Sequence, residues 1–527
     1  MNNSFGENTL NMPTSPCSKG SRGQSRNPLL LVTELMLPPL SVLRAQVYSA
    51  PVLPACRWIL AAFLGLTTFT LSTSGADESL LGEVVGDQDF PSLSLNTNGG
   101  YATWADNRVQ AGKEGKGIAA VALTPEGELD GVPFRVSQQT EGQQEHPQVL
   151  SLTGGGQLFF WEMRHGSKAG IYTRILGTNG DFALGDQLVS VPTSKLTQKQ
   201  ATNWTAYYRG VLKSRKHKFK ELITHTREQA GAAAVVALPD GGAMVVYHAM
   251  RRSDTNSWGL VERTYLRRGQ FIKDSVLRPY RVGADYMHDI FLQRLDNSGR
   301  KVGAEILANQ NVSFNQRTPS VTLLPDGKLA IVWVSETQQS YDWRANFRVN
   351  LVGRLFDTQG QPLGDEFSVT PPSQVVQANP VVSALSAGGF MVLWSQQEST
   401  GRGWDVFAQN LAADGSATGP AFRVNNFTTG DQFAPAIAAA GDDQLLVWTS
   451  VGQDGSREGV YGRRLQAGAL AGDEFRINQT TASRQFHPTV AADGRGGAVV
   501  LWSGFAGASG FDLFGAKFVL GGNQTGN

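Results

Sequence analysis

The chain has 527 residues, of which 60 are glycine and 17% are charged. This length is enough for several ordinary domains or for one large array of repeats, and the ordinary apolar content excludes a largely disordered protein. The net charge of +1 excludes a global attraction to nucleic acid or to an anionic membrane, so any charged partner must be bound by a local patch.

The first 76 residues are predicted to be a leader that ends in a secretory signal. Arg57 precedes the mostly apolar run WILAAFLGLTTFTL (58–71), and the small residues Ser74, Gly75 and Ala76 follow. A basic flank, an apolar core and a small-residue cleavage site are typical of exported proteins, whereas the run is short for a membrane span. We therefore expect a secreted, periplasmic or cell-surface protein. An uncleaved anchor or a buried helix is the alternative.

The predicted boundary at residue 76 has further consequences. The leader is unusually long, so Met36 is an alternative start. Both cysteines of the chain, Cys17 and Cys56, precede the boundary, so the mature part (77–527) is expected to have neither a disulfide nor thiol chemistry. Its stability must come from packing, with no membrane span once the signal is removed.

From residue 77 onward, one hairpin pattern recurs seven times. An apolar strand ends in an aromatic residue in each copy, at Trp104, Trp161, Tyr247, Trp333, Trp394, Trp448 and Trp502. Upstream of it a proline opens another apolar run, at Pro91, Pro147, Pro319, Pro380, Pro435 and Pro488, with Ala233 or Ala234 in the third copy. Two more short strands follow, so each unit has four strands bounded by Gly, Asp and Asn turns. Where the period is undisturbed, successive prolines lie 56, 61, 55 and 53 residues apart.

Seven such units predict an all-β fold, a seven-bladed β-propeller, with a solenoid as the main alternative. The recurring aromatic residue is expected to fill the space between adjacent blades. The seventh unit lacks a fourth strand, and the orphan segment LLGEVV (80–85) precedes the first unit. We therefore expect 80–85 to lie alongside the strand at 513–518 and to close the ring, which removes the open sheet edges.

The stretch WTSVGQDGSREGVYGRRL (448–465) resembles the repeats W-S-x-x-Q-D-G-S-x-x-G-V-Y-G-x-R of large secreted and surface proteins of bacteria. The resemblance covers residues 315–518 well and 86–191 more loosely. It implies an extracellular β-propeller and carries no defined reaction.

Two insertions interrupt the period, at 192–230 and at 249–289. The first lies between the fourth strand of unit two and the first strand of unit three, and the second lies between the second and third strands of unit three. In an up-and-down sheet these connections emerge on the same face, so we expect one helical and loop lid at blades 2–3. Long loops on a rigid scaffold commonly carry binding sites.

The composition of the insertions is basic. Residues 192–230 contain nine Lys or Arg against two Glu, and their apolar residues fall at helical spacing, which predicts an amphipathic helix with a basic face. Two interpretations remain: a solvated lid that pairs with its own acids, or a rim that binds an anionic polysaccharide or a surface protein. The expected binding residues are Lys213, Lys216, Lys220, Arg251, Arg252, Trp258, His146 and His165.

The histidines add candidates on the same face. His146 and His487 directly precede first-strand prolines, where the innermost strands meet the channel mouth, while His165, His248 and His288 lie in or beside connections between second and third strands. Their spacing forms no zinc motif, so no metal is expected. Turns such as QDGSREG would suit Ca²⁺, but they equally supply residues for tight turns; we expect no cofactor.

The leading functional hypothesis is a secreted, monomeric, non-catalytic propeller that binds a polymer or a partner protein at the basic rim, with no role for nucleic acid. One alternative is a polysaccharide lyase or glycosidase acting on acidic glycans there, with Tyr247, His248 and Arg251 as catalytic candidates. Another is a purely structural module of the cell envelope.

Overall fold

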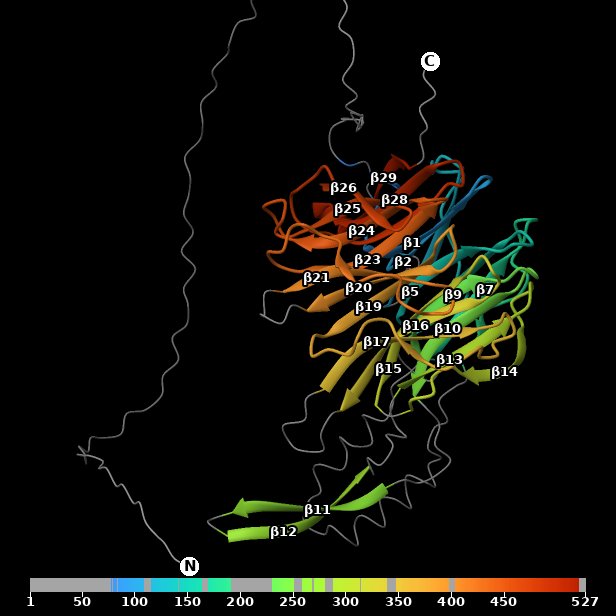
Figure 1. Cartoon of the computed structure of the whole chain (residues 1–527). Helices are drawn as coiled ribbons and strands as arrows, with labels where there is room; N and C mark the ends of the chain where they lie inside the picture. The colour runs from blue at the N-terminus through green and yellow to red at the C-terminus, as the bar shows by residue number, and fades with distance from the viewer. Residues whose placement is uncertain are drawn as a thin grey trace, which may run out of the picture. The chain divides into compact units, whose positions relative to one another are not determined.

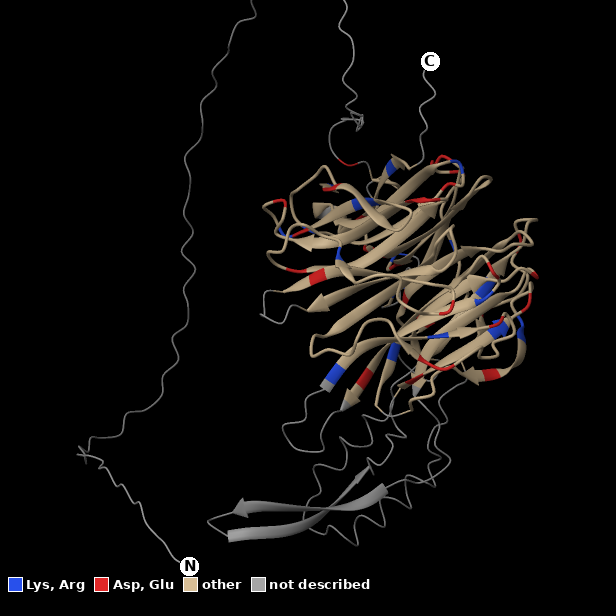
Figure 2. Cartoon of the chain, viewed as in Figure 1, with Lys and Arg blue, Asp and Glu red and all other residues tan. Residues whose placement is uncertain are grey.

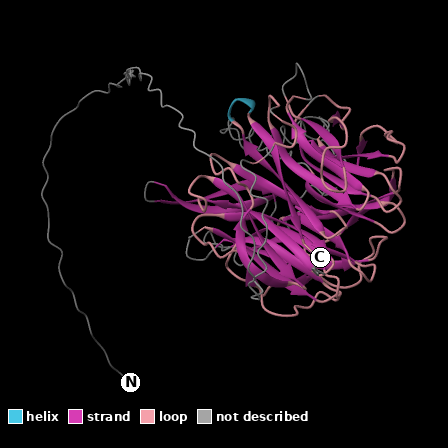
Figure 3. Cartoon of the chain, turned by 90° about the horizontal axis from the view of Figure 1, so that it is seen from above, coloured by secondary structure: helices cyan, strands magenta, loops and turns pink. Residues whose placement is uncertain are grey.

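The computed structural model describes residues 77–520, apart from 78, 83, 109–114, 141, 164–168, 191–229, 251–257, 268–269, 280–287, 313, 339–346 and 398–402. The predicted leader (1–76) and nearly all of the insertion 192–230, including its expected helix, lie outside the described residues. What is described is almost entirely β-structure (Figure 3).

Seven antiparallel sheets of three or four strands follow one another along the chain, which confirms the predicted seven-bladed β-propeller (Figure 1). The first three blades comprise β1 (Gln88–Asn96), β2 (Gly99–Asp106), β3 (Gly117–Leu123) and β4 (Phe134–Arg135); β5 (Gln144–Ser151), β6 (Gln157–Met163), β7 (Gly170–Leu176) and β8 (Gln187–Leu188); and β9 (Gly231–Ala237), β10 (Ala243–Met250), β13 (His288–Leu295) and β14 (Lys301–Leu307).

The remaining blades repeat this order. Blades 4 and 5 comprise β15 (Gln316–Leu323), β16 (Leu329–Gln338), β17 (Phe347–Phe356) and β18 (Phe367–Ser368); and β19 (Gln377–Ala384), β20 (Phe390–Gln397), β21 (Trp404–Leu411) and β22 (Phe422–Arg423). Blades 6 and 7 comprise β23 (Gln432–Ala440), β24 (Asp443–Val451), β25 (Glu458–Gln466) and β26 (Ala469–Arg476); and β27 (Gln485–Ala492), β28 (Gly497–Phe505) and β29 (Phe511–Val519), with the single-turn 3₁₀ helix η1 (Gly507–Ser509) before β29.

The core lies between the blades. Seven apolar clusters each combine side chains of two neighbouring blades, and one of them joins Leu93 and Trp104 of blade 1 to Leu501 and Leu513 of blade 7. The seven recurring aromatic residues are at most 1% exposed, and each lies in the cluster shared with the preceding blade. This confirms the packing role predicted for them.

Each innermost strand begins with a bulge. In six blades the strand starts at a buried glutamine: Gln88, Gln144, Gln316, Gln377, Gln432 and Gln485. Two positions after each of these glutamines, and directly after Gly231 in blade 3, stands a non-glycine residue in the left-handed region, with φ between 45° and 54°: Phe90, His146, Ala232, Thr318, Asn379, Ala434 and His487. The pairing with the second strand shifts register at this point in all seven blades. A bulge interrupts the ladder, so the proline that follows in six blades loses no required hydrogen bond.

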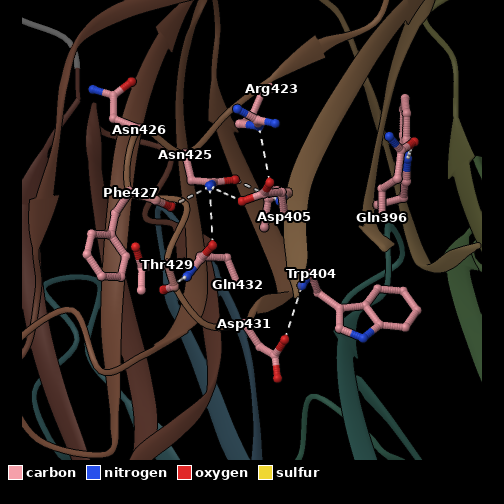
Figure 4. Close-up of polar contacts among 12 residues, drawn as sticks. Gln396, Trp404, Asp405, Arg423, Asn425, Asn426, Phe427, Thr429, Asp431 and Gln432 are labelled. Carbon is pink, nitrogen blue, oxygen red and sulfur yellow. Dashed lines mark hydrogen bonds and ion pairs between the residues drawn. The ribbon is translucent and has the colours of Figure 1, made fainter. Parts of the chain in front are cut away.

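The connections between blades are held by buried polar networks, of which Figure 4 shows one. Asn425 Oδ1 accepts a hydrogen bond from the Val406 N–H (2.8 Å), and Asn425 Nδ2 donates to Asp405 Oδ1 (2.6 Å). The N–H of Trp404 donates to Asp431 Oδ1 (3.1 Å), which fixes the linker into blade 6. Asn309 and Asp289 repeat the central pair in blade 3 at 2.7 Å.

The N-terminal segment contacts β29 of blade 7 around Ser79 and Leu80, at the start of the predicted range. Ser79 forms an isolated antiparallel bridge with Phe514, and the Leu80 N–H donates to Leu513 O at 2.7 Å. No strand is formed over 80–85; the residues described there lie in turns and bends, with Gly82 at a φ of 74°. Glycine accepts this left-handed conformation readily, so the chain turns away after Leu80. Ring closure by a strand at 80–85 is therefore not shown.

The second insertion (249–289) contains a two-stranded hairpin. Strands β11 (Trp258–Arg267) and β12 (Gln270–Pro279) pair with each other and with no other described strand. The expected helical and loop lid is not shown, because the described part of this insertion is a hairpin and the predicted helix falls in the undescribed range.

Candidate binding face at the channel mouth

The propeller has one face at which the first strands begin and the second strands end, and we call it the mouth face. Gly231 at the start of β9 is paired with His248 near the end of β10, and Met250 is paired with His288 at the start of β13. Both insertions therefore join blade 3 at the mouth face.

Three rings from consecutive blades meet on this face. Phe90 of blade 1 lies between His487 of blade 7 and His146 of blade 2, with ring centroids 4.3 Å apart on both sides. The ring of His487 is nearly parallel to that of Phe90 (21°), whereas His146 meets it edge-on (63°). We call Phe90, His146 and His487 the mouth arc. All three occupy the left-handed bulge position, which turns their side chains to the same part of the fold.

A carboxylate and an ammonium group flank the arc. His487 Nδ1 donates to Asp89 Oδ1 at 2.9 Å, and the Phe90 N–H donates to the same oxygen at 2.8 Å. Lys116 Nζ lies 3.6 Å from Asp89 Oδ2 and 5.7 Å from the centroid of the Phe90 ring. The arc therefore combines ring faces with an ion-paired carboxylate.

The pKa of Asp89 lies below its ordinary value. Burial raises it, but the lowering contributions together outweigh burial, first among them the hydrogen bond from His487 and the charge of that imidazole. The N–H of Phe90 and the charge of Lys116 lower the pKa further. Each of these groups stabilises the ionised carboxylate, so Asp89 is charged and acts as an acceptor near neutral pH.

A second carboxylate, Glu162, supports the arc from blade 2. His146 Nδ1 lies 3.4 Å from Glu162 Oε2, and Glu162 Oε1 accepts the Ala232 N–H of blade 3 at 2.5 Å. Glu162 directly follows the recurring aromatic Trp161. Glu162 thus links blade 2 to the bulge of the next blade.

His248 and Ser395 occupy the position of Glu162 in blades 3 and 5. His248 Nδ1 accepts the Thr318 N–H at 3.3 Å, and Ser395 Oγ accepts the Ala434 N–H at 3.2 Å. Because Nδ1 of His248 is an acceptor, the neutral ring carries its proton on Nε2. To act as a general base, His248 would have to accept a proton on Nδ1, and this atom already accepts the backbone N–H of Thr318 in blade 4.

Tyr247, the other catalytic candidate among the described residues, lies deeper in the fold, and so does the histidine His288. Tyr247 is fully buried, and its hydroxyl donates to the Glu305 carboxylate. His288 is also buried; its ring centroid is 4.9 Å from that of His248, and its Nδ1 is 3.2 Å from Asn315 Oδ1.

Of the binding residues expected from the sequence, His146 lies in the mouth arc. Trp258 begins β11, whose side chains are not described. The other expected residues, including the catalytic candidate Arg251, lie outside the described residues: Lys213, Lys216, Lys220, Arg251, Arg252 and His165.

Sequence reasoning missed Phe90, Asp89, Lys116 and Glu162 as site residues. A signal for Phe90 is present in the repeats, since QDFP, QEHP and QFHP place it in the same position as His146 and His487. A phenylalanine in a predicted strand is usually interpreted as a core residue, so the equivalence of Phe90 with His146 and His487 was overlooked.

Charges of both signs are interspersed over the described blades (Figure 2). Near the mouth face several described cations are paired with carboxylates, for example Arg317 with Glu336 and Arg423 with Asp405. The predicted basic rim thus depends on residues of the insertions. Among the described residues, no group of three or more His, Cys, Asp or Glu is arranged to hold a metal ion, and no helix in that part of the chain is both long and apolar enough to cross a bilayer.

No protein family model and no curated protein matches the chain. The fold is similar to that of a protein of unknown function from Dyadobacter fermentans, at 10% identity and a TM-score of 0.44 over 73% of this chain and 97% of that chain. It is also similar to that of the NanB sialidase from Streptococcus pneumoniae, at 9% identity and a TM-score of 0.44 over 73% of this chain and 69% of that chain. The GH93 α-L-arabinofuranosidase of Fusarium graminearum is similar at 9% identity and a TM-score of 0.39, over 83% of this chain and 96% of that chain. At these identities the likeness concerns the fold alone.

Proposed function

We propose that this protein is a secreted, non-catalytic β-propeller that binds a carbohydrate polymer through its mouth face. The mouth arc is the observation that carries the proposal. Sugars present C–H faces that stack on aromatic rings, and hydroxyl groups that hydrogen-bond to charged side chains. Phe90 between two imidazoles, with Asp89 and Lys116 beside it, offers both kinds of group within one partly exposed cluster.

An acidic polymer fits the whole face best. The charges described around the arc are balanced, but both insertions join the same face and 192–230 carries nine Lys or Arg against two Glu. Such a surplus attracts a polyanion, and the attraction is screened by salt. We therefore propose that the arc supplies stacking and that the insertions supply the charge.

Binding without turnover is favoured by the state of the charged groups. The lowered pKa of Asp89 keeps this carboxylate ionised, so it is a poor general acid. His248 Nδ1 is occupied by the Thr318 N–H. These two observations support a recognition site over a proton-transfer site.

A glycan array followed by titration calorimetry tests the proposal. We expect binding to an acidic polysaccharide that weakens as salt is raised, and a loss of about tenfold in affinity for Phe90→Ala, from about 1.4 kcal/mol of lost stacking. Alanine occupies the same bulge position in blades 3 and 6, as Ala232 and Ala434, so this variant should fold.

The matched control is Phe182→Ala, which removes a partly buried ring that packs against Phe134 and Phe159, away from the arc. Equal losses for Phe90→Ala and Phe182→Ala would show that the arc is not the site. Release of shortened or unsaturated products from the bound polymer would show that the protein is an enzyme and would contradict the non-catalytic proposal. Capture of a protein but of no glycan would show that the ligand is not a carbohydrate.

A further inference from the structure

Aromatic rings continue from the mouth arc outward over blade 7. The centroid of Phe486 is 4.4 Å from that of His487, Phe511 is 5.1 Å from Phe486, and Phe505 is 5.5 Å from Phe511. Successive rings meet at interplanar angles of 71°, 86° and 70°. We call Phe486, Phe511 and Phe505 the blade-7 row. None of the three is buried, and Phe505 is 43% exposed.

The strand ends of blade 7 position the row. Phe486 is the second residue of β27, Phe505 ends β28, and Phe511 begins β29 as its direct cross-strand partner. Cross-strand neighbours on one face of a sheet lie within contact distance, so the rings form a continuous surface at the mouth face.

The propeller scaffold does not require aromatic residues at these positions. The same three positions can be compared in four other blades in which they are described. They hold Asp89, Asn107 and Lys116 in blade 1; Arg317, Glu336 and Val349 in blade 4; Ala378, Gln397 and Trp404 in blade 5; and Phe433, Val451 and Glu458 in blade 6. No blade in this comparison has more than one aromatic residue there. The repeat alone therefore does not account for the three aromatic rings in blade 7.

A charged pair borders the row as Asp89 and Lys116 border the arc. Arg484 Nε and Nη2 donate to the two carboxylate oxygens of Glu458 at 2.9 and 2.7 Å, and the guanidinium lies 5.2 Å from the Phe486 centroid. The Arg484 side chain is 43% exposed. Bidentate pairing fixes the guanidinium plane and leaves it able to donate outward.

We propose that the blade-7 row extends the mouth arc into a track for an extended saccharide chain, so that the protein binds internal stretches of a polymer and not only a terminal sugar. The chain would run from the channel mouth across blade 7, with successive units on successive rings and hydroxyl or carboxylate groups at Arg484. This inference rests on the proposed function and adds the length and direction of its ligand.

A length series tests the track on the purified full-length protein. Di-, tetra- and octamers of galacturonate, with cello-oligosaccharides of the same lengths as neutral probes, are titrated by calorimetry. We expect affinity to rise with length in the series that binds. Phe505→Ala should cancel most of that rise, about tenfold for the octamer, and leave the affinity for the dimer unchanged. His487→Ala should weaken binding at every length.

The matched control is Val519→Ala, which alters an exposed apolar residue of the same blade at the far end of β29. Phe505 is the most exposed ring of the row, so its substitution should leave the melting temperature unchanged. Length-independent binding, or equal losses for dimer and octamer in Phe505→Ala, would overturn the track and leave the proposed function standing. Absence of binding to every saccharide on the array and in the series would contradict both.

Discussion

At the scale of single residues, the charge of Asp89 is the most consequential feature of the site. Its carboxylate receives His487 and the Phe90 N–H on one oxygen and Lys116 on the other. A carboxyl group with a lowered pKa stabilises the folded state above its ordinary pKa, and that contribution is lost as the pH falls through the folded pKa. The arc is therefore coupled to stability in acid.

We expect Asp89→Asn to lower the free energy of unfolding by about 1 kcal/mol near neutral pH, because a charge-assisted contact is lost. The deficit should shrink as the pH falls below the ordinary carboxyl pKa, where wild type loses the same contact. Urea denaturation at a series of pH values measures this. A deficit that stays constant down to strongly acidic pH would mean that the Asp89 charge is not what the variant removes.

The left-handed bulge position offers a second test. Thr318 is β-branched and has a φ of 47°, whereas blade 5 has Asn379 there with a φ of 51°. Asparagine tolerates this region better than a β-branched residue. Thr318→Asn should raise the free energy of unfolding by about 1 kcal/mol, measured by urea denaturation. Asn379→Thr is the reciprocal variant and should lower it by a similar amount.

At the scale of elements, the polar networks between strands differ from blade to blade, and blade 6 combines Gly459 with Asn478, whose Oδ1 accepts the Val460 N–H. Blades 3 and 5 combine Asp at the start of the third strand with Asn after the fourth, as in Asp405 and Asn425. Blades 1 and 2 combine glycine with serine, and Ser137 Oγ and Ser190 Oγ accept the equivalent backbone N–H groups. A buried carboxylate needs the amide donor, which serine cannot replace with the same reach.

A double-mutant cycle tests whether Asp405 depends on Asn425. Asn425→Ser should cost about 2 kcal/mol, because Asp405 loses a buried partner. Adding Asp405→Gly, which recreates the pairing of blades 1 and 2, should recover part of that loss. Thermal and urea unfolding of the two single variants and the double variant give the coupling energy. Additive losses would show that the two side chains act independently.

At the scale of the whole molecule, the seam between blades 7 and 1 has contacts at both ends of the disc. Away from the mouth face, Arg495 binds Glu126 and the Thr97 carbonyl, and Lys517 binds Glu128. At blade 7, Leu80 repeats a hydrogen bond that the other six blades form with their own outer strand: Val136, Val189, Ala308, Val369, Val424 and Ile477 each donate to the equivalent carbonyl of the third strand.

Asp77 extends this equivalence. Its carboxylate accepts the N–H groups of Gln479 (2.6 Å) and Thr480 (2.8 Å) in the linker after blade 6. Asp186 and Glu366 directly precede β8 and β18, and Glu474 lies in β26; all three bind the linkers after the preceding blades in the same way.

We expect Asp77→Ala to speed amide exchange in β29 and in the linker at 479–480 while leaving blades 3 to 5 unchanged, as measured by hydrogen–deuterium exchange. Local opening follows the loss of contacts that hold a segment in place. Glu474→Ala is the matched control and should act at the linker after blade 5. Uniform acceleration in all blades for Asp77→Ala would mean a global loss of stability and no special role at the seam.

Much of the fold was predictable because the recurring residues have packing or backbone roles that every blade needs. A large aromatic residue is needed at each of seven junctions, and a proline is tolerated at each bulge, so Trp448 and Pro435 recur at fixed spacing. The bulge conformation was hidden, since the residues that adopt positive φ, such as Phe90, are not glycine. The contact of Leu80 with Leu513 falls within the predicted ranges, but the bridge at Ser79 was missed because the apolar run at 80–85 looked more like a strand than the polar residues before it.

The site was predictable only in part for a similar reason. His146 stood out by its rarity and its place before a proline, but Phe90 and Phe486 are ordinary strand residues until the bulge and the seam bring them together. Contacts between blades 7 and 1 join residues about 400 apart, such as His487 and Asp89 (398 apart). No local pattern encodes such a pairing.

This meeting of distant segments governs the order in which the protein can mature. Asp77 and the Gln479 N–H are separated by 402 positions, so one partner has been synthesised long before the other exists, and pairings of such high contact order form slowly. Until blade 7 is made, blade 1 lacks Val499, Leu501 and Leu513, its partners in the apolar cluster that the two blades share, and the unfinished chain carries two uncovered sheet flanks. A chain that ended before blade 7 would thus expose apolar surface on both flanks, and the proposed track over blade 7 would be the last part of the surface to form.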